Sequence, residues 1–140
     1  MLSGECQHNV DAKGRMIVPA KFRDDLGEKF VITKGLDNCI FVYEMSAWLK
    51  LEETLVKLPL ADSDIKRFFI GGKEEVEMDK QGRILIPQHL REHAKLEKDA
   101  VSVGVGDRME IWDKSAWKQK GEKFTSAPGD LTARLDSLGI

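Results

Sequence analysis

The sequence predicts an α+β protein built from two tandem copies of one module, in which β-hairpins are combined with short helices. The main observation is an internal repeat, because residues 11–19 (DAKGRMIVP) return as residues 79–87 (DKQGRILIP). Short β-branched runs bounded by glycine and proline indicate strands, and apolar residues at helical spacing indicate helices. Two copies are too few for a solenoid, so we expect them to pack on each other as a pseudo-twofold pair.

The repeat continues beyond this motif, which favours a duplication over a chance match. Phe22-Arg23 corresponds to Leu90-Arg91, and Ser46-Ala47-Trp48 corresponds to Ser115-Ala116-Trp117. We therefore divide the chain into four parts: a first module at 5–47, a helical connector at 48–75, a second module at 76–119 and a C-terminal tail at 120–140.

The first copy opens with a predicted hairpin. Residues 5–10 alternate polar and apolar side chains, as a half-buried strand does. Asp11 is a favourable first residue for the turn that follows, and Gly14 can adopt a positive φ there. The apolar run at 16–18 then predicts a buried return strand.

A helix and a second hairpin complete the first copy. Pro19 suits the first position of a helix, which the sequence ends at Gly27. Apolar runs predict strands at 30–33 and 39–43. Ser46 is then expected to cap a longer helix that carries Trp48 on its apolar side.

The second half repeats this order after a short helix in the connector, which Asp62 or Ser63 caps and Gly71-Gly72 ends. The predicted elements are strands at 76–78 and 84–86, a helix from Pro87, strands at 101–105 and 109–112, and a helix from Ser115 that stops at Gly121. Leucines in the tail predict either a docking helix or a frayed end, and the pattern does not decide between them.

The composition is typical of a globular protein in water, with 41% hydrophobic and 33% charged residues. No apolar run approaches the roughly 20 residues of a membrane span, and the N-terminus lacks the pattern of a signal peptide. Cys6 and Cys39 are too few for a disulfide scaffold, so we expect two buried thiols in the cytoplasm. The net charge of −2 argues against nucleic-acid binding unless basic residues gather on one face.

The two Asp-x-x-x-Arg turns are the strongest candidates for a functional site. They could be purely structural, with Asp bonding the backbone and pairing weakly with Arg at the surface. However, Lys13 accompanies Arg15 in the first turn and Lys80 accompanies Arg83 in the second, so each turn has a net positive charge. Two basic turns related by a pseudo-twofold axis suit the phosphates of a nucleic-acid backbone.

The chain resembles the MraZ family, bacterial regulators built from two copies of an AbrB-like swapped-hairpin module. The resemblance covers essentially residues 1–120. The resemblance rests mainly on two stretches of sequence. One is the first motif together with Val18-Pro19-Ala20-Lys21-Phe22-Arg23, and the other is Arg67-Phe68-Phe69 followed by the second motif at 79–87. Paired Asp-x-x-x-Arg elements, each followed by an apolar residue and proline, are specific, whereas a single one would be weak.

The resemblance implies a swapped-hairpin barrel inside one chain, with flanking helices, and assembly of several chains into a homo-oligomeric ring. It implies a nucleoid-associated regulator that binds short direct repeats in double-stranded DNA upstream of its own gene, in the operon for cell division and cell-wall synthesis. By motif match, the expected DNA contacts are Lys13, Arg15, Lys80 and Arg83. The expected loop-structuring residues are Asp11, Gly14, Asp79 and Gly82.

A ring-forming protein-interaction scaffold with incidental basic turns is the main alternative. Phe68 and Phe69 would then face a partner, although we expect them in the core or at an oligomer interface. Trp48 and Trp117 are expected core anchors. We expect no enzyme activity, cofactor or small-molecule substrate, because no nucleophile lies in an activating context such as Gly-x-Ser-x-Gly.

The remaining polar candidates are assigned structural roles. His89 and His93 have the spacing of a zinc pair, but nothing obvious completes a metal site, so no metal is expected. Lys21 corresponds to His89 in the second copy, so neither is assigned to DNA. Arg23 and Arg91 match each other, and we expect them to serve packing or an ion pair between the modules.

Overall fold

The computed structural model describes residues 1–126 and 128–140. Its strands are β1 (Leu2–Asn9), β2 (Arg15–Ile17), β3 (Lys29–Lys34), β4 (Ile40–Glu44), β5 (Glu74–Glu77), β6 (Arg83–Leu85), β7 (Asp99–Gly106) and β8 (Met109–Asp113). Its helices are α1 (Ala20–Leu26), α2 (Met45–Val56), α3 (Ser63–Phe69), α4 (Gln88–His93), α5 (Lys114–Thr125) and α6 (Pro128–Ser137), with a 3₁₀ turn at Leu60–Asp62. The predicted α+β class with two tandem copies is confirmed.

The strands pair across the two copies rather than only within them. One antiparallel sheet has the order β1-β7-β8-β4-β3-β5, and β2 pairs with β6 in a separate two-stranded sheet. Strand β1 of the first copy thus lies beside β7 of the second, and β5 of the second copy lies beside β3 of the first. Exchanging each strand for its repeat equivalent reproduces the same order, so the pairing is symmetric about the β4–β8 junction.

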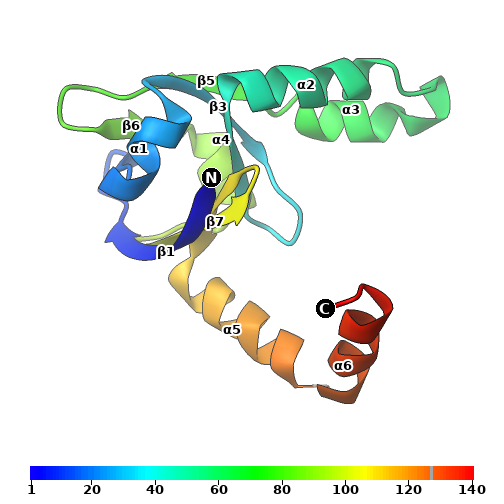
Figure 1. Cartoon of the computed structure of the whole chain (residues 1–140). Coiled ribbons are helices and arrows are strands. Elements are labelled where there is room, and N and C mark those ends of the chain that lie inside the picture. The colour runs from blue at the N-terminus through cyan, green and yellow to red at the C-terminus, as the bar shows by residue number, and fades with distance from the viewer. Residues whose placement is uncertain (127) are drawn as a thin grey trace.

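The inner strands β3 and β4 of the large sheet are buried on both faces, which explains their continuous apolar runs. On one face, Phe30 and Ile32 pack in a cluster with Phe22 of α1 and Leu90 of α4. On the other face, residues such as Val31 pack against α2, α3 and α5. Figure 1 shows α1 and α4 on one side of the molecule, with α2 and α3 together at another. The small sheet of β2 and β6 joins the first cluster.

Two predicted core assignments need correction. Trp48 is fully buried, as predicted, but Trp117 is only partly buried and packs 5.5 Å from Trp112, measured between ring centroids. Cys39 is buried, whereas Cys6 is only half-buried, because β1 is an edge strand of the sheet. Burial raises the pKa of the Cys39 thiol well above its ordinary value, which keeps that thiol protonated.

The start of α2 differs from the prediction that Ser46 caps it. The carboxylate of Glu44 instead accepts hydrogen bonds from the backbone N–H groups of Ser46 and Ala47. In the second copy, Asp113 accepts from the N–H of Ala116. A carboxylate satisfies the free N–H groups of a helix start and also interacts favourably with the helix dipole.

The end of α5 also differs from the prediction. Gly121 does not stop this helix, which continues to Thr125 and has 12 residues, as α2 does. Gly121 is exposed and nothing lies within 4 Å of the position that its Cβ would take. Glycine in a helix interior costs only about 1 kcal/mol relative to alanine, which the rest of α5 tolerates.

The leucines of the C-terminal tail lie in or next to helix α6. Of the two alternatives that the sequence left open, the structure therefore shows a helix and not a frayed end. Leu131 and Leu135 of α6 are half-buried, and the helix contacts α5. Figure 1 shows α5 and α6 extending away from the strands. Among the described helices, none combines the length and apolar character that crossing a membrane requires.

Candidate nucleic-acid interface

The first Asp-x-x-x-Arg turn is closed by the Asp11 side chain. Oδ1 of Asp11 accepts from the backbone N–H groups of Lys13 and Arg15, each at 2.9 Å. Oδ2 accepts from Nε of Arg15 at 3.0 Å. Gly14 adopts a φ of +85°, a region that side chains with a Cβ rarely enter. One carboxylate thus holds both the backbone of the turn and the base of its guanidinium.

The second turn repeats this geometry residue by residue. Oδ1 of Asp79 accepts from the backbone N–H groups of Gln81 and Arg83, each at 2.9 Å. Oδ2 accepts from Nε of Arg83 at 2.8 Å. Gly82 has a φ of +76°. The duplication has therefore preserved a defined side-chain arrangement as well as the sequence letters.

These hydrogen bonds act on the ionisation of the two aspartates. The backbone N–H of Arg15 is the main cause that lowers the pKa of Asp11 below its ordinary value, and the Arg15 side chain lowers it further. Arg83 lowers the pKa of Asp79 in the same way. Both carboxylates are thus ionised at neutral pH, and each offsets one arginine. A lysine then leaves each turn with one net positive charge.

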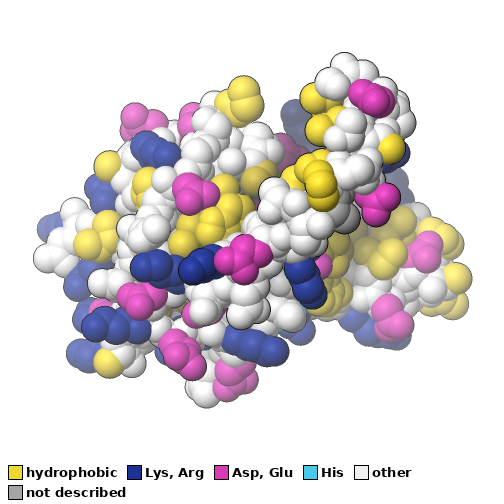
Figure 2. Space-filling model, turned by 90° about the horizontal axis from the view of Figure 1, so that it is seen from below, with side chains coloured by type: hydrophobic (Ala, Val, Ile, Leu, Met, Phe, Trp, Pro, Cys, Tyr) yellow, Lys and Arg dark blue, Asp and Glu magenta, His cyan; other side chains and the backbone are white. Residues whose placement is uncertain are grey.

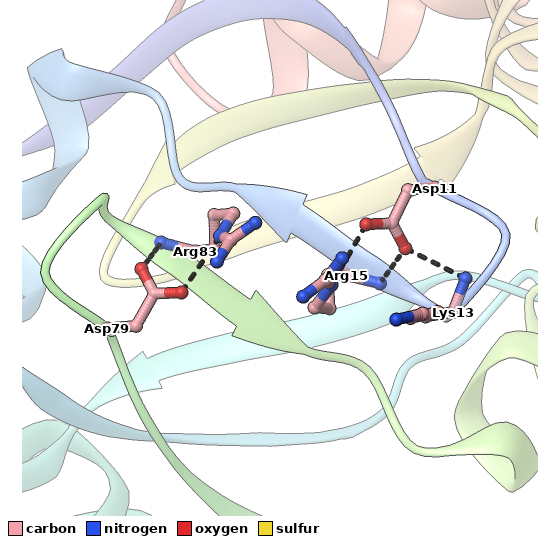
Figure 3. Close-up of polar contacts among 5 residues, drawn as sticks. All are labelled: Asp11, Lys13, Arg15, Asp79 and Arg83. Carbon is pink, nitrogen blue, oxygen red and sulfur yellow. Dashed lines mark hydrogen bonds and ion pairs between the residues drawn. The ribbon is translucent and has the colours of Figure 1, made fainter.

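The pairing of β2 with β6 places the two turns at opposite ends of one structure. We call residues 14–18 and 82–86 the ribbon. Its register pairs Arg15 with Leu85 and Ile17 with Arg83. The N–H of Val18 donates to the carbonyl of Gly82, and that of Ile86 donates to the carbonyl of Gly14, both at 2.9 Å. In Figure 3, Arg15 and Arg83 project from the same side of the ribbon.

The ribbon contains two exposed apolar side chains that the sequence prediction missed. Met16 and Ile84 point into the core and are each 1% exposed, but Ile17 and Leu85 are 52% and 56% exposed. A run of three apolar residues suggested complete burial, whereas the strand alternation turns the first and third residues inward and the middle residue outward. Arg15, Ile17, Arg83 and Leu85 therefore share one face, which we call the ribbon face.

Arg23 and Arg91 cross between the copies and lie against the opposite turn. A Cβ on Gly82 would lie 2.5 Å from Cζ of Arg23, and one on Gly14 would lie 2.6 Å from Cζ of Arg91. Nε of Arg23 also donates to the carbonyl of Val18 at 2.9 Å. The predicted packing role between modules is confirmed. The described contacts include no ion pair for either arginine.

The two lysines are exposed but occupy different positions of the repeat. Lys13 corresponds to Gln81, whereas Lys80 corresponds to Ala12. In Figure 3, Lys13 lies beside the ribbon at the Asp11 end. In the face that Figure 2 shows, basic and acidic side chains are interspersed over the surface. Charge in that view does not form a broad basic field.

Phe68 and Phe69 lie at the end of α3. Phe69 is partly buried and stacks on Phe41, with ring centroids 6.2 Å apart. Phe68 contacts Phe69 edge-on at 4.9 Å and His93 at 5.7 Å. Both rings are therefore half-buried, with one side against the protein.

His89 and His93 contact different parts of the backbone. Nε2 of His93 lies 2.8 Å from the carbonyl of Gly35, and Nε2 of His89 lies 3.3 Å from the carbonyl of Gly72. Within the described residues, no group of three or more His, Cys, Asp or Glu side chains could hold a metal ion. The geometry of this pair is that of side chains anchored to neighbouring loops.

The fold and the site together define a class of protein. Its members are α+β proteins with two copies of one module, and their strands pair across the copies. The two Asp-x-x-x-Arg turns lie at opposite ends of one ribbon. A family model described as "MraZ protein" matches residues 1–68 and 69–135. The chain therefore belongs to the MraZ family.

Named relatives match along their whole length. The chain is 52% identical over 143 residues to "Transcriptional regulator MraZ" of Caldanaerobacter subterraneus subsp. tengcongensis, covering 100% of both chains. It is 55% identical over 141 residues to the protein of the same name from Desulforamulus reducens, covering 99% of each. The protein of that name from Acetivibrio thermocellus is 52% identical over 143 residues.

Proposed function

We propose that this chain is a transcriptional regulator that binds double-stranded DNA through the ribbon and its two turns. The observation that carries this proposal is the placement of Arg15 and Arg83 on one face, each held at Nε by an aspartate. The names of the relatives support a role in transcription. Lys13 and Lys80 supply further phosphate contacts at the two ends, while Asp11, Gly14, Asp79 and Gly82 keep the turns in shape.

The bound arrangement follows from the chemistry of arginine. Aspartate occupies Nε, and the described protein residues accept no hydrogen bond from the terminal amino groups of Arg15 or Arg83. Those amino groups can therefore form a bidentate contact to a phosphate or to the O6 and N7 atoms of guanine. The aspartates do not touch the anionic backbone, because they are already committed to the turn.

We further propose that the modules at 5–47 and 76–119 interlock as a swapped-hairpin barrel, joined by the connector at 48–75 and followed by the tail at 120–140. The pairing of β1 with β7 and of β5 with β3 supports this architecture. Such exchange holds the two turns in a fixed relation, so they meet DNA as one unit.

We also propose that several chains form a ring, and that this ring is located at the nucleoid in the cytoplasm. The side of α3 that carries Phe68 and Phe69 would then lie near the contact between subunits. Ile65 of α3 is 42% exposed beside these rings and would add apolar area to that contact. One chain offers only two basic turns, so its contact with DNA is weak. A ring brings several ribbons to short direct repeats, such as those upstream of its own gene in the operon for cell division and cell-wall synthesis. Linked contacts then gain avidity.

The experiment compares wild type with the Arg15→Ala/Arg83→Ala variant for binding to the DNA upstream of its own gene, with light scattering as the assembly check. We expect the variant to keep its assembly and to bind DNA at least tenfold more weakly. This estimate assumes that each good bidentate arginine contact contributes about 1–3 kcal/mol to binding. Lys57→Ala/Arg134→Ala is the matched control, because it removes two exposed positive charges away from the ribbon. Equal binding by wild type and the ribbon variant would make the turns structural and favour the scaffold function.

A further inference from the structure

Two aliphatic side chains on the ribbon face have no role in the core. Ile17 is 52% exposed and Leu85 is 56% exposed, although the residues before them in each strand are buried. They occupy equivalent positions of the two copies, directly after the Gly-Arg-apolar sequence of each turn. A strand face that contacts only water is expected to carry polar residues. The duplicated aliphatic residue therefore needs another explanation.

The register arranges the four side chains of the ribbon face as a checkerboard. Arg15 lies opposite Leu85, and Ile17 lies opposite Arg83. Side chains directly opposite are about 5 Å apart at Cβ, and diagonal neighbours are about 7–8 Å apart. Each aliphatic group therefore has an arginine across from it and another along its own strand. Charge and apolar surface alternate within one small patch.

The dimensions of this patch match the major groove of B-form DNA. Alternate residues of a strand are about 7 Å apart, which corresponds to about two base-pair steps of 3.4 Å. The major groove is about 12 Å wide and admits a two-stranded ribbon, whereas the minor groove is about 6 Å wide. A ribbon that lays its outward face on the base edges would bring all four side chains to about two or three base pairs.

The charges of the patch disfavour a second copy of this chain as its occupant. Two copies packed face to face would place four guanidinium groups together, and like charges in contact are repulsive. DNA attracts those same groups through phosphate or guanine. In the major groove, the apolar feature that distinguishes bases is the C5-methyl group of thymine. An aliphatic side chain beside a guanine-reading arginine thus fits a thymine next to a G·C pair.

We propose that Ile17 and Leu85 read thymine methyl groups in the major groove and so help to determine the DNA sequence that the ribbon binds. This inference rests on the proposed DNA-binding function. It assigns sequence discrimination to two residues outside the charged motif. The bound site should contain thymines within two or three base pairs of the positions that Arg15 and Arg83 contact.

The test removes one partner of the contact at a time, either the thymine methyl group or the aliphatic side chain. The upstream duplex is prepared with thymine or with deoxyuridine, which lacks only the C5-methyl group, and is bound by wild type or by Ile17→Ala/Leu85→Ala. For wild type, we expect deoxyuridine to weaken binding by roughly fourfold for each contacted methyl group. For the double variant, binding to the thymine duplex is already weaker and deoxyuridine has no further effect.

The matched control is Leu36→Ala/Leu49→Ala, which removes two leucines that are 58% and 55% exposed away from the ribbon. This control should show the same deoxyuridine effect as wild type. Thermal unfolding and light scattering check that each variant keeps its fold and assembly.

Three results would overturn the inference. An equal deoxyuridine effect in wild type and in Ile17→Ala/Leu85→Ala would do so, and loss of affinity in Arg15→Ala/Arg83→Ala would then still support the proposed function. A change of assembly in Ile17→Ala/Leu85→Ala would show instead that the ribbon face lies between copies. No binding of wild type to the upstream duplex would remove both proposals.

Discussion

At the scale of single residues, each turn depends on one carboxylate that serves several donors. Asp11 accepts two backbone N–H groups and one guanidinium N–H, and Asp79 does the same. Asp in these positions therefore holds Arg15 and Arg83 in place. The site combines a rigid base with guanidinium ends that face outward.

This arrangement predicts a specific dependence on pH. The pKa of Asp11 and of Asp79 is lowered in the folded chain. The stabilisation from these bonds is therefore present above the ordinary aspartate pKa of about 3.9, and it is lost as the pH falls through the lowered folded value. Carboxyl-carbon NMR titrations should show midpoints below the ordinary value for both residues.

The Arg15→Ala/Arg83→Ala variant provides the internal comparison for that titration. Its midpoints should rise only partway, because the largest cause of each shift is the backbone N–H of residue 15 or 83, which alanine retains. Midpoints at or above the ordinary value in wild type would show that the carboxylates do not accept these bonds.

At the scale of elements, the ribbon requires glycine at both turns. Two constraints act on Gly14. Its φ is +85°, and the guanidinium of Arg91 lies so close that its Cζ would be 2.6 Å from a Cβ added at Gly14. Gly14→Ala should therefore destabilise the fold by about 1–3 kcal/mol, as expected for a strained backbone. Chemical denaturation measures this loss. Adding Arg91→Ala should recover only the part that comes from the close contact.

Gly121→Ala is the matched control for this substitution, since Gly121 lies within α5 and has open space around it. Alanine there should stabilise the helix by about 0.5–1 kcal/mol. If Gly14→Ala proved as harmless as Gly121→Ala, the positive φ and the Arg91 contact would not constrain the turn.

The sequence predicts the geometry of each turn better than it predicts which side chains are buried or which residue caps a helix. The positive φ of Gly14 follows from turn chemistry that acts within five residues. The outward position of Ile17 was missed, because a short apolar run looks the same whether one or all of its side chains are buried. The cap by Glu44 was missed because a serine nearby is an equally good acceptor by residue type.

At the scale of the whole molecule, the two copies share their strands and so should unfold together. Repetition in the sequence indicated two modules, but periodicity cannot show which strand pairs with which, because each pairing joins residues far apart in the chain. The pairing of β1 with β7 and of β2 with β6 leaves neither copy with a complete sheet of its own. Unfolding should therefore be a single transition.

Tryptophan fluorescence can test this coupling, because Trp48 lies in the first copy and Trp112 and Trp117 lie in the second. Urea unfolding of Trp48→Phe would report on the second copy, and that of Trp112→Phe/Trp117→Phe would report on the first. For each variant, the fluorescence midpoint should coincide with the midpoint from far-UV circular dichroism at one protein concentration. Separate midpoints within one variant would mean that the copies fold independently.

We propose that both turns contact DNA as parts of one ribbon, and the salt dependence of binding is the decisive test of this claim. The slope of log affinity against log salt is measured for wild type, Arg15→Ala, Arg83→Ala and the double variant on the upstream duplex. If both arginines contact phosphates, each single substitution should reduce the slope by about 1 per chain bound, and the double by about 2. An unchanged slope with a large loss of affinity would assign the arginines to base edges. Unchanged slope and unchanged affinity in all three variants would contradict the claim.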